Sequence, residues 1–134
     1  MGLEVRGMTP HLAVFDMPTS LKFYRDALGF EIAASSGNPP DCGWVMLKRD
    51  GVELMLNTAY DEGERPEKMD SSRIGAHEDT TLYFACPDVD GAYEHLKAVG
   101  LPVKAPEVAW YGMRQLYFTD PDGYLLCLQS AVKK

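Results

Sequence analysis

The order of apolar and polar residues repeats once along the chain. An alternating apolar stretch at residues 9–14 is followed by a helical pattern at 19–28, and the same order returns at residues 80–86 and 88–99. Equivalent positions in the two stretches lie 70 to 72 residues apart. A spacing that drifts so slowly indicates one small module that has been duplicated.

Each module continues with three further strand patterns. We expect strands at residues 30–34, 44–47 and 52–56 of the first module, and at 101–104, 114–118 and 124–128 of the second. An Asp-Gly turn, at residues 50–51 and again at 122–123, precedes the last strand of each. The predicted fold class is therefore α+β, with two tandem βαβββ modules that form concave mixed sheets and carry their helices on one face.

The whole chain of 134 residues is expected to form one domain. The first module covers residues 8–58 and the second covers 80–130. Residues 59–79 between them are polar and charged, which predicts a linker that is either a flexible connection or a lid. We expect the first helix to be capped by Thr19 or Ser20.

Strand alternation divides the side chains of each sheet between two faces. The more uniformly apolar positions are expected to pack on the helices: Leu12, Val14, Leu54, Leu56, Leu82, Phe84, Cys86, Leu126 and Leu128. The other face carries a mixture of polar, aromatic and soft side chains: His11, Ala13, Phe15, Glu53, Met55, Asn57, Thr81, Tyr83, Ala85, Leu125, Cys127 and Gln129. An apolar lining with a few polar groups is typical of a ligand cleft. The alternative is that this face packs against another sheet.

Aromatic residues near this face extend the ligand hypothesis. Trp44, Tyr83, Trp110 and Tyr111 could stack on a planar or cationic ligand. The alternative is that Trp44 belongs to the core and that Trp110 anchors a loop. The histidines outside the strands, His77 and His95, are expected to be solvated.

Composition and charge narrow the class of partner. A net charge of −7 argues against nucleic acid, which normally needs a basic face, and is compatible with a cationic ligand. No apolar run approaches the roughly 18 residues of a membrane span, and the N-terminus lacks the apolar core of a signal peptide. The three cysteines form no CxxC pair, so free thiols in the reducing cytoplasm are expected.

Three motifs together resemble one family. They are TPHLAVFD at residues 9–16, SLKFYRDALGF at 20–30, and GMR at 112–114 running into TDPDG at 119–123. With the duplicated module they resemble the vicinal oxygen chelate superfamily of glyoxalases, extradiol dioxygenases and bleomycin-resistance proteins. The resemblance implies metal-ligand positions at His11, Met55, Thr81 and Cys127. His11 alone matches the His or Glu pattern of metal-dependent members, so we expect neither a metal nor another cofactor.

Within the superfamily the chain looks closest to the metal-free bleomycin-resistance branch. The stretch GWVMLKRDGVEL at residues 43–54 is similar to that branch, as is the aromatic-Gly pair Tyr111-Gly112. The resemblance implies a homodimer that sequesters an aromatic or cationic small molecule, with Glu53 as a charge partner. The expected ligand-binding residues are His11, Phe15, Trp44, Glu53, Met55, Asn57, Thr81, Tyr83, Trp110, Tyr111, Arg114 and Cys127.

Two other functions remain open from the residues. The first is an enzyme of the same superfamily, a lyase, isomerase or dioxygenase that acts on a small carbonyl or thiol-adduct substrate through a metal, or through acid–base chemistry by His11 with Glu53. The second is a structural or regulatory module. No phosphate loop, nucleophile elbow or redox CxxC favours any other class of enzyme.

Overall fold

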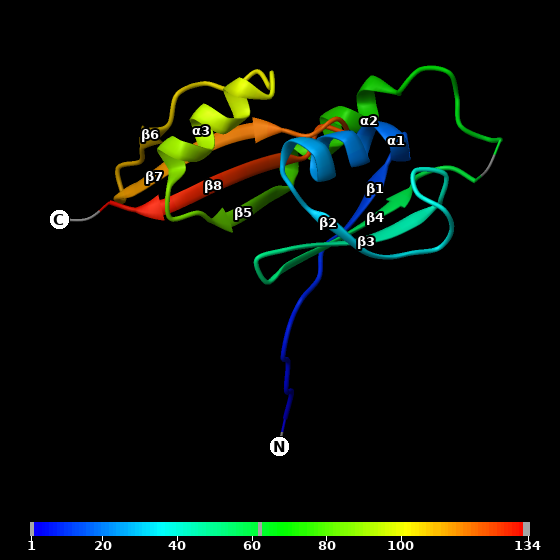
Figure 1. Ribbon diagram of the computed structural model, residues 1–134, viewed down its shortest axis with the longest axis horizontal. Helices are drawn as coiled ribbons and strands as arrows, with labels where there is room; N and C mark the ends of the chain where they lie inside the picture. The colour runs from blue at the N-terminus through cyan, green and yellow to red at the C-terminus, as the bar shows by residue number, and fades with distance from the viewer. Residues whose placement is uncertain (1, 62, 133–134) are drawn as a thin grey trace. The chain divides into compact units, whose positions relative to one another are not determined.

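The computed structural model describes residues 2–61 and 63–132 (Figure 1). It contains two compact units, Met1–Pro66 and Glu67–Lys134. Each unit holds one four-stranded mixed sheet with helical segments, so the predicted α+β class and the tandem modules are confirmed.

The first unit follows the predicted order of strands and helix. Its elements are β1 (His11–Val14), α1 (Met17–Leu21), η1 (Lys22–Ala27), β2 (Glu31–Ser35), β3 (Trp44–Arg49) and β4 (Val52–Thr58). The strands are ordered β1-β4-β3-β2, with β1 parallel to β4 and the other pairs antiparallel.

The second unit has the same connectivity after one additional helix. Its elements are α2 (Ser71–Ala76), η2 (His77–Asp79), β5 (Thr81–Ala85), α3 (Val89–Ala98), β6 (Glu107–Val108), β7 (Met113–Thr119) and β8 (Leu125–Ala131). The strand order β5-β8-β7-β6 and the parallel pair β5 and β8 reproduce the first sheet. In Figure 1, α3 lies along one face of this sheet.

The core of the first unit forms where the helix covers the sheet. Leu12, Val14, Leu54 and Leu56 are buried, as the alternation predicts. Tyr24 of η1 is fully buried, with edge-on contacts to Phe23 and Phe30 at ring-centroid distances of 4.9 and 6.2 Å. In the second sheet Leu126 is buried, whereas Leu82, Phe84, Cys86 and Leu128 on the same face are half-buried.

The first helix begins earlier than predicted, and its cap is a different residue. The cap is Asp16, whose carboxylate accepts a hydrogen bond from the Thr19 backbone N–H at 3.1 Å. The expected caps Thr19 and Ser20 lie inside the helix, in its first turn. The helix can begin before Pro18 because the first backbone N–H groups of a helix have no partner within it, so a proline there loses no hydrogen bond. The second half of the helix is π-wound, with the Leu28 N–H donating to the Phe23 carbonyl.

The second strand of the second module lies later than predicted. Residues 101–104 form no strand, and pairing with β7 occurs instead at Glu107–Val108. Pro102 lies within the expected range and Pro106 follows two residues after it, and a proline cannot donate to a strand ladder. The hydrogen-bonded strand therefore begins only after the second proline.

Part of the predicted linker is a helix that packs on the Asp120–Gly123 turn. The Arg73 guanidinium on α2 pairs with the buried Asp122 carboxylate at 2.6 Å. His77 Nδ1 lies 2.7 Å from the Asp122 carbonyl oxygen, and its ring stacks on Tyr124 at 3.9 Å. The expectation that His77 is solvated is therefore wrong, because the helix carries its ring against the turn.

The same turn leaves no space at Gly123. This residue has φ +88, and a Cβ there would lie 2.6 Å from Ile74 Cγ2 and 2.9 Å from the Ile74 carbonyl oxygen. The Asp120 carboxylate accepts hydrogen bonds from the backbone N–H groups of Asp122 and Tyr124. The TDPDG motif is thus a tight turn that docks α2. No helix in the described part of the chain is long and apolar enough to cross a membrane.

Candidate functional site

The helix-free face of the first sheet carries a ladder of soft and polar side chains. The register places His11 beside Met55 and Met55 beside Met46, while Ala13, Asn57 and Trp44 form the next row. His11 is exposed, and the other five residues are half-buried. The Trp44 side chain therefore lies on the other face of β3 from the buried side chains of Val45 and Leu47, so Trp44 does not belong to the core beneath the helix.

The charges on this face are already paired. Glu53 lies opposite Lys48 in the register, and the Lys48 Nζ is 3.3 Å from a Glu53 carboxylate oxygen. Asn57 donates a hydrogen bond from Nδ2 to the Thr58 carbonyl at 3.1 Å. The rest of the ladder offers an imidazole, two thioethers and an indole, which is a surface suited to apolar and aromatic groups.

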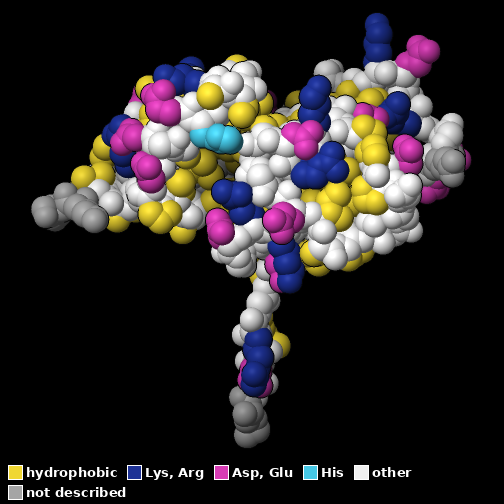
Figure 2. All heavy atoms as spheres, in the orientation of Figure 1, with side chains coloured by type: hydrophobic (Ala, Val, Ile, Leu, Met, Phe, Trp, Pro, Cys, Tyr) yellow, Lys and Arg dark blue, Asp and Glu magenta, His cyan; other side chains and the backbone are white. Residues whose placement is uncertain are grey.

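The helix-free face of the second sheet is built around two tyrosines and a cysteine. Tyr83, Cys127 and Tyr117 occupy one row across β5, β8 and β7. The two phenol oxygens lie 3.1 Å apart, and the rings meet edge-on at 6.3 Å. Tyr83 is 53% and Tyr117 39% exposed, whereas Cys127 is fully buried between them. Figure 2 shows hydrophobic side chains at the surface of this unit, and its exposed large hydrophobic residues include Tyr83 on β5 and Tyr117 on β7.

The Tyr117 hydroxyl and the Cys127 thiol stay protonated at neutral pH. The hydrogen bond that Tyr117 shares with Tyr83, together with desolvation, raises the pKa of the Tyr117 phenol above its usual range. Burial raises the pKa of the Cys127 thiol. A neutral thiol is a weak nucleophile and a poor metal ligand, since both roles need the thiolate. The row therefore offers neutral hydrogen-bonding groups and aromatic surface.

An amide network extends the tyrosine row. Gln115 Nε2 donates to the Tyr111 hydroxyl at 2.8 Å and to Gln129 Oε1 at 2.9 Å. Tyr111 in turn meets the Trp110 indole edge-on at 5.3 Å, and Trp110 is 95% exposed. The aromatic surface thus continues from the sheet onto the loop before β7.

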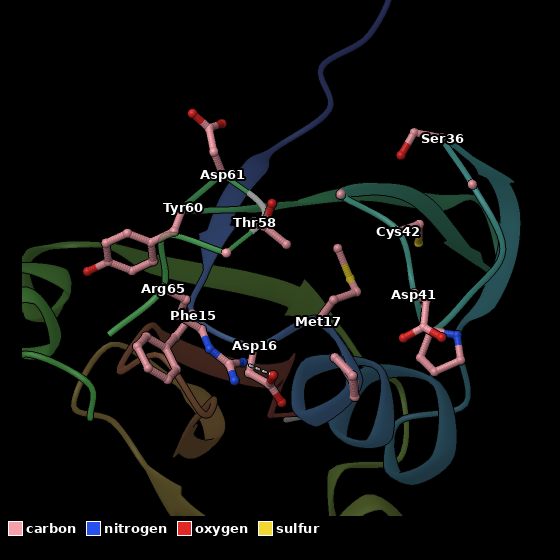
Figure 3. A pocket seen from close by; sticks show the side chains of 15 residues that line it. Phe15, Asp16, Met17, Ser36, Asp41, Cys42, Thr58, Tyr60, Asp61 and Arg65 are labelled. Atoms are coloured by element: carbon pink, nitrogen blue, oxygen red, sulfur yellow. Dashed lines mark hydrogen bonds and ion pairs between the residues drawn. The ribbon is translucent and has the colours of Figure 1, made fainter. Parts of the chain in front are cut away.

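A separate cavity lies at the strand ends of the first unit. We call it the strand-end pocket: it measures about 510 Å³ and is lined by segments 15–18, 36–37, 40–43, 58, 60–61, 63 and 65. Figure 3 shows Phe15, Asp16 and Arg65 together on one side of the opening and Asp41 and Cys42 on the other. Burial raises the pKa of the Cys42 thiol, so this group too is protonated.

Arg65 occupies one wall of the strand-end pocket. Its guanidinium forms an ion pair with Asp16 and lies over the Phe15 ring, 5.1 Å from the centroid. Tyr60 meets the same ring edge-on at 6.0 Å. Partial burial raises the pKa of Asp16, but hydrogen bonds from Thr19 and Arg65 outweigh that effect and hold the pKa below its usual range.

The structure brings the predicted binding residues together only in part. Those on the helix-free face of their own sheet are His11, Trp44, Glu53, Met55, Asn57, Thr81, Tyr83 and Cys127. Tyr111 joins its sheet face through Gln115, and Trp110 touches Tyr111. Phe15 lines the strand-end pocket instead. Arg114 lies on the helix side of β7, where its guanidinium binds Asp90 of α3 at 2.6 Å.

Several residues at these sites were not predicted. Tyr117 and Gln115 are on β7, and the alternation rule applied to that strand would have found both. Asp16, Tyr60 and Arg65 of the strand-end pocket lie in a turn and in the polar segment after β4. No local pattern marks that contact, because it joins residues 49 positions apart.

The four positions implied for a metal do not form a suitable set of ligands. His11 and Met55 are cross-strand neighbours, but Thr81 pairs with Leu125 while Cys127 pairs with Tyr83. A thioether, a hydroxyl and a protonated thiol are poor ligands for a divalent ion. Among residues 2–61 and 63–132, no three His, Cys, Asp or Glu side chains are grouped to hold one. The residues present do not fit this metal.

Comparison with known proteins agrees with the duplicated architecture. Residues 8–128 match the family model described as Glyoxalase/Bleomycin resistance protein/Dioxygenase superfamily. The chain belongs to this superfamily. The repeated βαβββ connectivity agrees with membership of this superfamily.

Several similar proteins in this superfamily are bleomycin resistance or bleomycin-binding proteins. A bleomycin resistance protein of Geobacillus stearothermophilus is 29% identical over 131 residues, which cover 92% of this chain and 96% of that protein. A bleomycin-binding protein solved in complex with bleomycin is 25% identical with a TM-score of 0.69, covering 97% of this chain and 100% of that one. The bleomycin resistance determinant encoded on transposon Tn5 is 25% identical with a TM-score of 0.70, covering 95% and 98%.

Proposed function

We propose that this protein is a binding protein of the bleomycin-resistance type, which captures an aromatic or cationic antibiotic and withholds it from its target. The observation that carries the proposal is the exposed tyrosine row of the second sheet, Tyr83 and Tyr117 over the buried Cys127. The 29% identity to a bleomycin resistance protein across 92% of the chain supports the same function.

The physical basis of this capture is stacking and burial. Tyr83 and Tyr117 expose aromatic surface that water solvates poorly, and a planar ligand laid on the rings would remove that surface from water. Their hydroxyls and the amides of Gln115 and Gln129 supply the few polar contacts that orient a ligand. The Glu53 carboxylate already forms an ion pair with Lys48, so our proposal does not rely on Glu53 to bind a charged group of the ligand.

Binding of bleomycin tests this function. Titration of the purified protein with bleomycin, followed by tryptophan fluorescence and calorimetry, is expected to show saturable binding. Tyr83→Ala should weaken that affinity by about tenfold or more, because an aromatic contact in a binding site is often a hot spot. Tyr93→Ala is the matched control, since Tyr93 lies on α3 under Lys97. An equal loss in both variants, or no saturable binding of bleomycin or of other planar antibiotics, would contradict the proposal.

The assembly and location that we propose rest on the resemblance to the bleomycin-resistance branch and on the free thiols. We propose a cytoplasmic homodimer that needs no metal and acts on neither nucleic acid nor membrane. Cys42, Cys86 and Cys127 are all free thiols, as expected for a reducing compartment. Light scattering of the purified protein measures the mass of the assembly directly, and metal analysis of protein prepared without chelator measures metal content.

A further inference from the structure

The strand-end pocket contains a cation of the protein's own at its aromatic wall. Among the described lining residues, Arg65 is the one basic side chain, and the same cavity is also lined by Asp16, Asp41 and Asp61. The guanidinium takes both interactions that a planar cation can make, the ion pair with Asp16 and the stack over Phe15. The Asp16 carboxylate and the Phe15 ring, which we call the seat of the Arg65 guanidinium, are therefore complementary to a planar cation.

Arg65 is held in that seat only weakly. Its side chain is 47% exposed, and an ion pair at such a surface position contributes little stability because water screens it. The cavity of about 510 Å³ is much larger than one guanidinium group needs. A ligand can thus enter beside Arg65 and compete with it for the same carboxylate and ring.

We propose that the strand-end pocket binds an organic cation with a planar amidinium or guanidinium head, on the seat that the Arg65 guanidinium occupies. Asp16 takes the charge, Phe15 stacks on the plane of the head, and the edge-on Tyr60 closes the aromatic wall. Asp41 and Asp61 add negative potential at the rim. This site goes beyond the proposed function, because none of the tyrosine-row residues lines it and it shares only Phe15 with the predicted binding residues.

Benzamidine and its neutral isostere benzamide test the proposal. Calorimetry at low ionic strength is expected to show weak binding of benzamidine and none of benzamide. Arg65→Ala should tighten benzamidine binding by roughly 5- to 30-fold, because removal of an exposed ion pair and one cation–π contact removes an internal competitor. A purely structural role for Arg65 predicts the opposite sign. The matched control is Arg25→Ala, which removes the same charge from an exposed pair with Asp26.

A second variant separates charge from folding. Asp16→Asn keeps a good helix cap, since Asn and Asp cap about equally well, and should abolish the gain in the Arg65→Ala background. Amide chemical shifts should change in residues 36–43 and 58–61 on addition of benzamidine. The proposal is overturned if Arg65→Ala binds benzamidine no more tightly than Arg25→Ala, if benzamide binds equally, or if the shifts map to the tyrosine row instead.

Discussion

Arg73→Ala is expected to lower the free energy of unfolding of the second unit by about 3 kcal/mol. Its guanidinium lies 2.6 Å from the Asp122 carboxylate, and the two side chains are 15% and 1% exposed. Removal of one partner from such a pair leaves a desolvated charge without its counter-ion, which is far more costly than the net worth of the pair. Urea unfolding followed by circular dichroism measures the change.

The control for this prediction is Arg114→Ala. Arg114 and Asp90 are also 2.6 Å apart, but their side chains are 35% and 66% exposed. Water screens that pair, so we expect a loss below about 1 kcal/mol. Arg73→Lys keeps the charge but not the planar fork and should fall between wild type and Arg73→Ala. Equal losses from Arg73→Ala and Arg114→Ala would show that burial does not govern the Asp122 contact.

The sequence predicted the fold well because its signals are local and occur twice. Alternation in β1 and β4 correctly assigned Leu12 and Leu56 to the core, and the repeat indicated the same connectivity for both sheets. The errors fall where a distant contact overrides the local pattern. Helix α2 is only six residues long, and it packs on Asp122 and Gly123, some 50 residues away in the sequence. The local sequence pattern therefore did not predict this helix.

The site could be predicted less completely than the fold. Alternation placed Met55, Asn57, Tyr83 and Cys127 on the helix-free faces, because the face of a strand residue depends only on its parity. The repeat was less reliable for strand register. His11 pairs with Met55 in the first sheet, but the equivalent residues Thr81 and Cys127 do not pair, because Cys127 pairs with Tyr83. Ion pairs such as that between Arg65 and Asp16 depend on how distant chain segments meet in space, which the pattern of apolar and polar residues does not predict.

Substitution of two neighbouring residues of β4 should lower stability by different amounts. Leu56 is fully buried against the helix, so Leu56→Ala should cost roughly 2–5 kcal/mol of the free energy of unfolding. Met55 is half-buried on the other face beside His11, and Met55→Ala should cost about 1 kcal/mol, since less of its side chain leaves water on folding.

The binding measurement completes this comparison. If the helix-free face of the first sheet contacts the ligand, Met55→Ala should weaken bleomycin binding severalfold, while Leu56→Ala, assayed well below its unfolding midpoint, should leave the affinity near wild type. Unfolding by urea and calorimetric titration with bleomycin give the two quantities on the same preparations. A large stability loss in Met55→Ala would mean that this face is packed rather than open to ligand, which is the alternative that alternation alone could not exclude. The pair therefore tests the face on which the proposed function depends, because strand geometry separates a core contact from a ligand contact by a single residue.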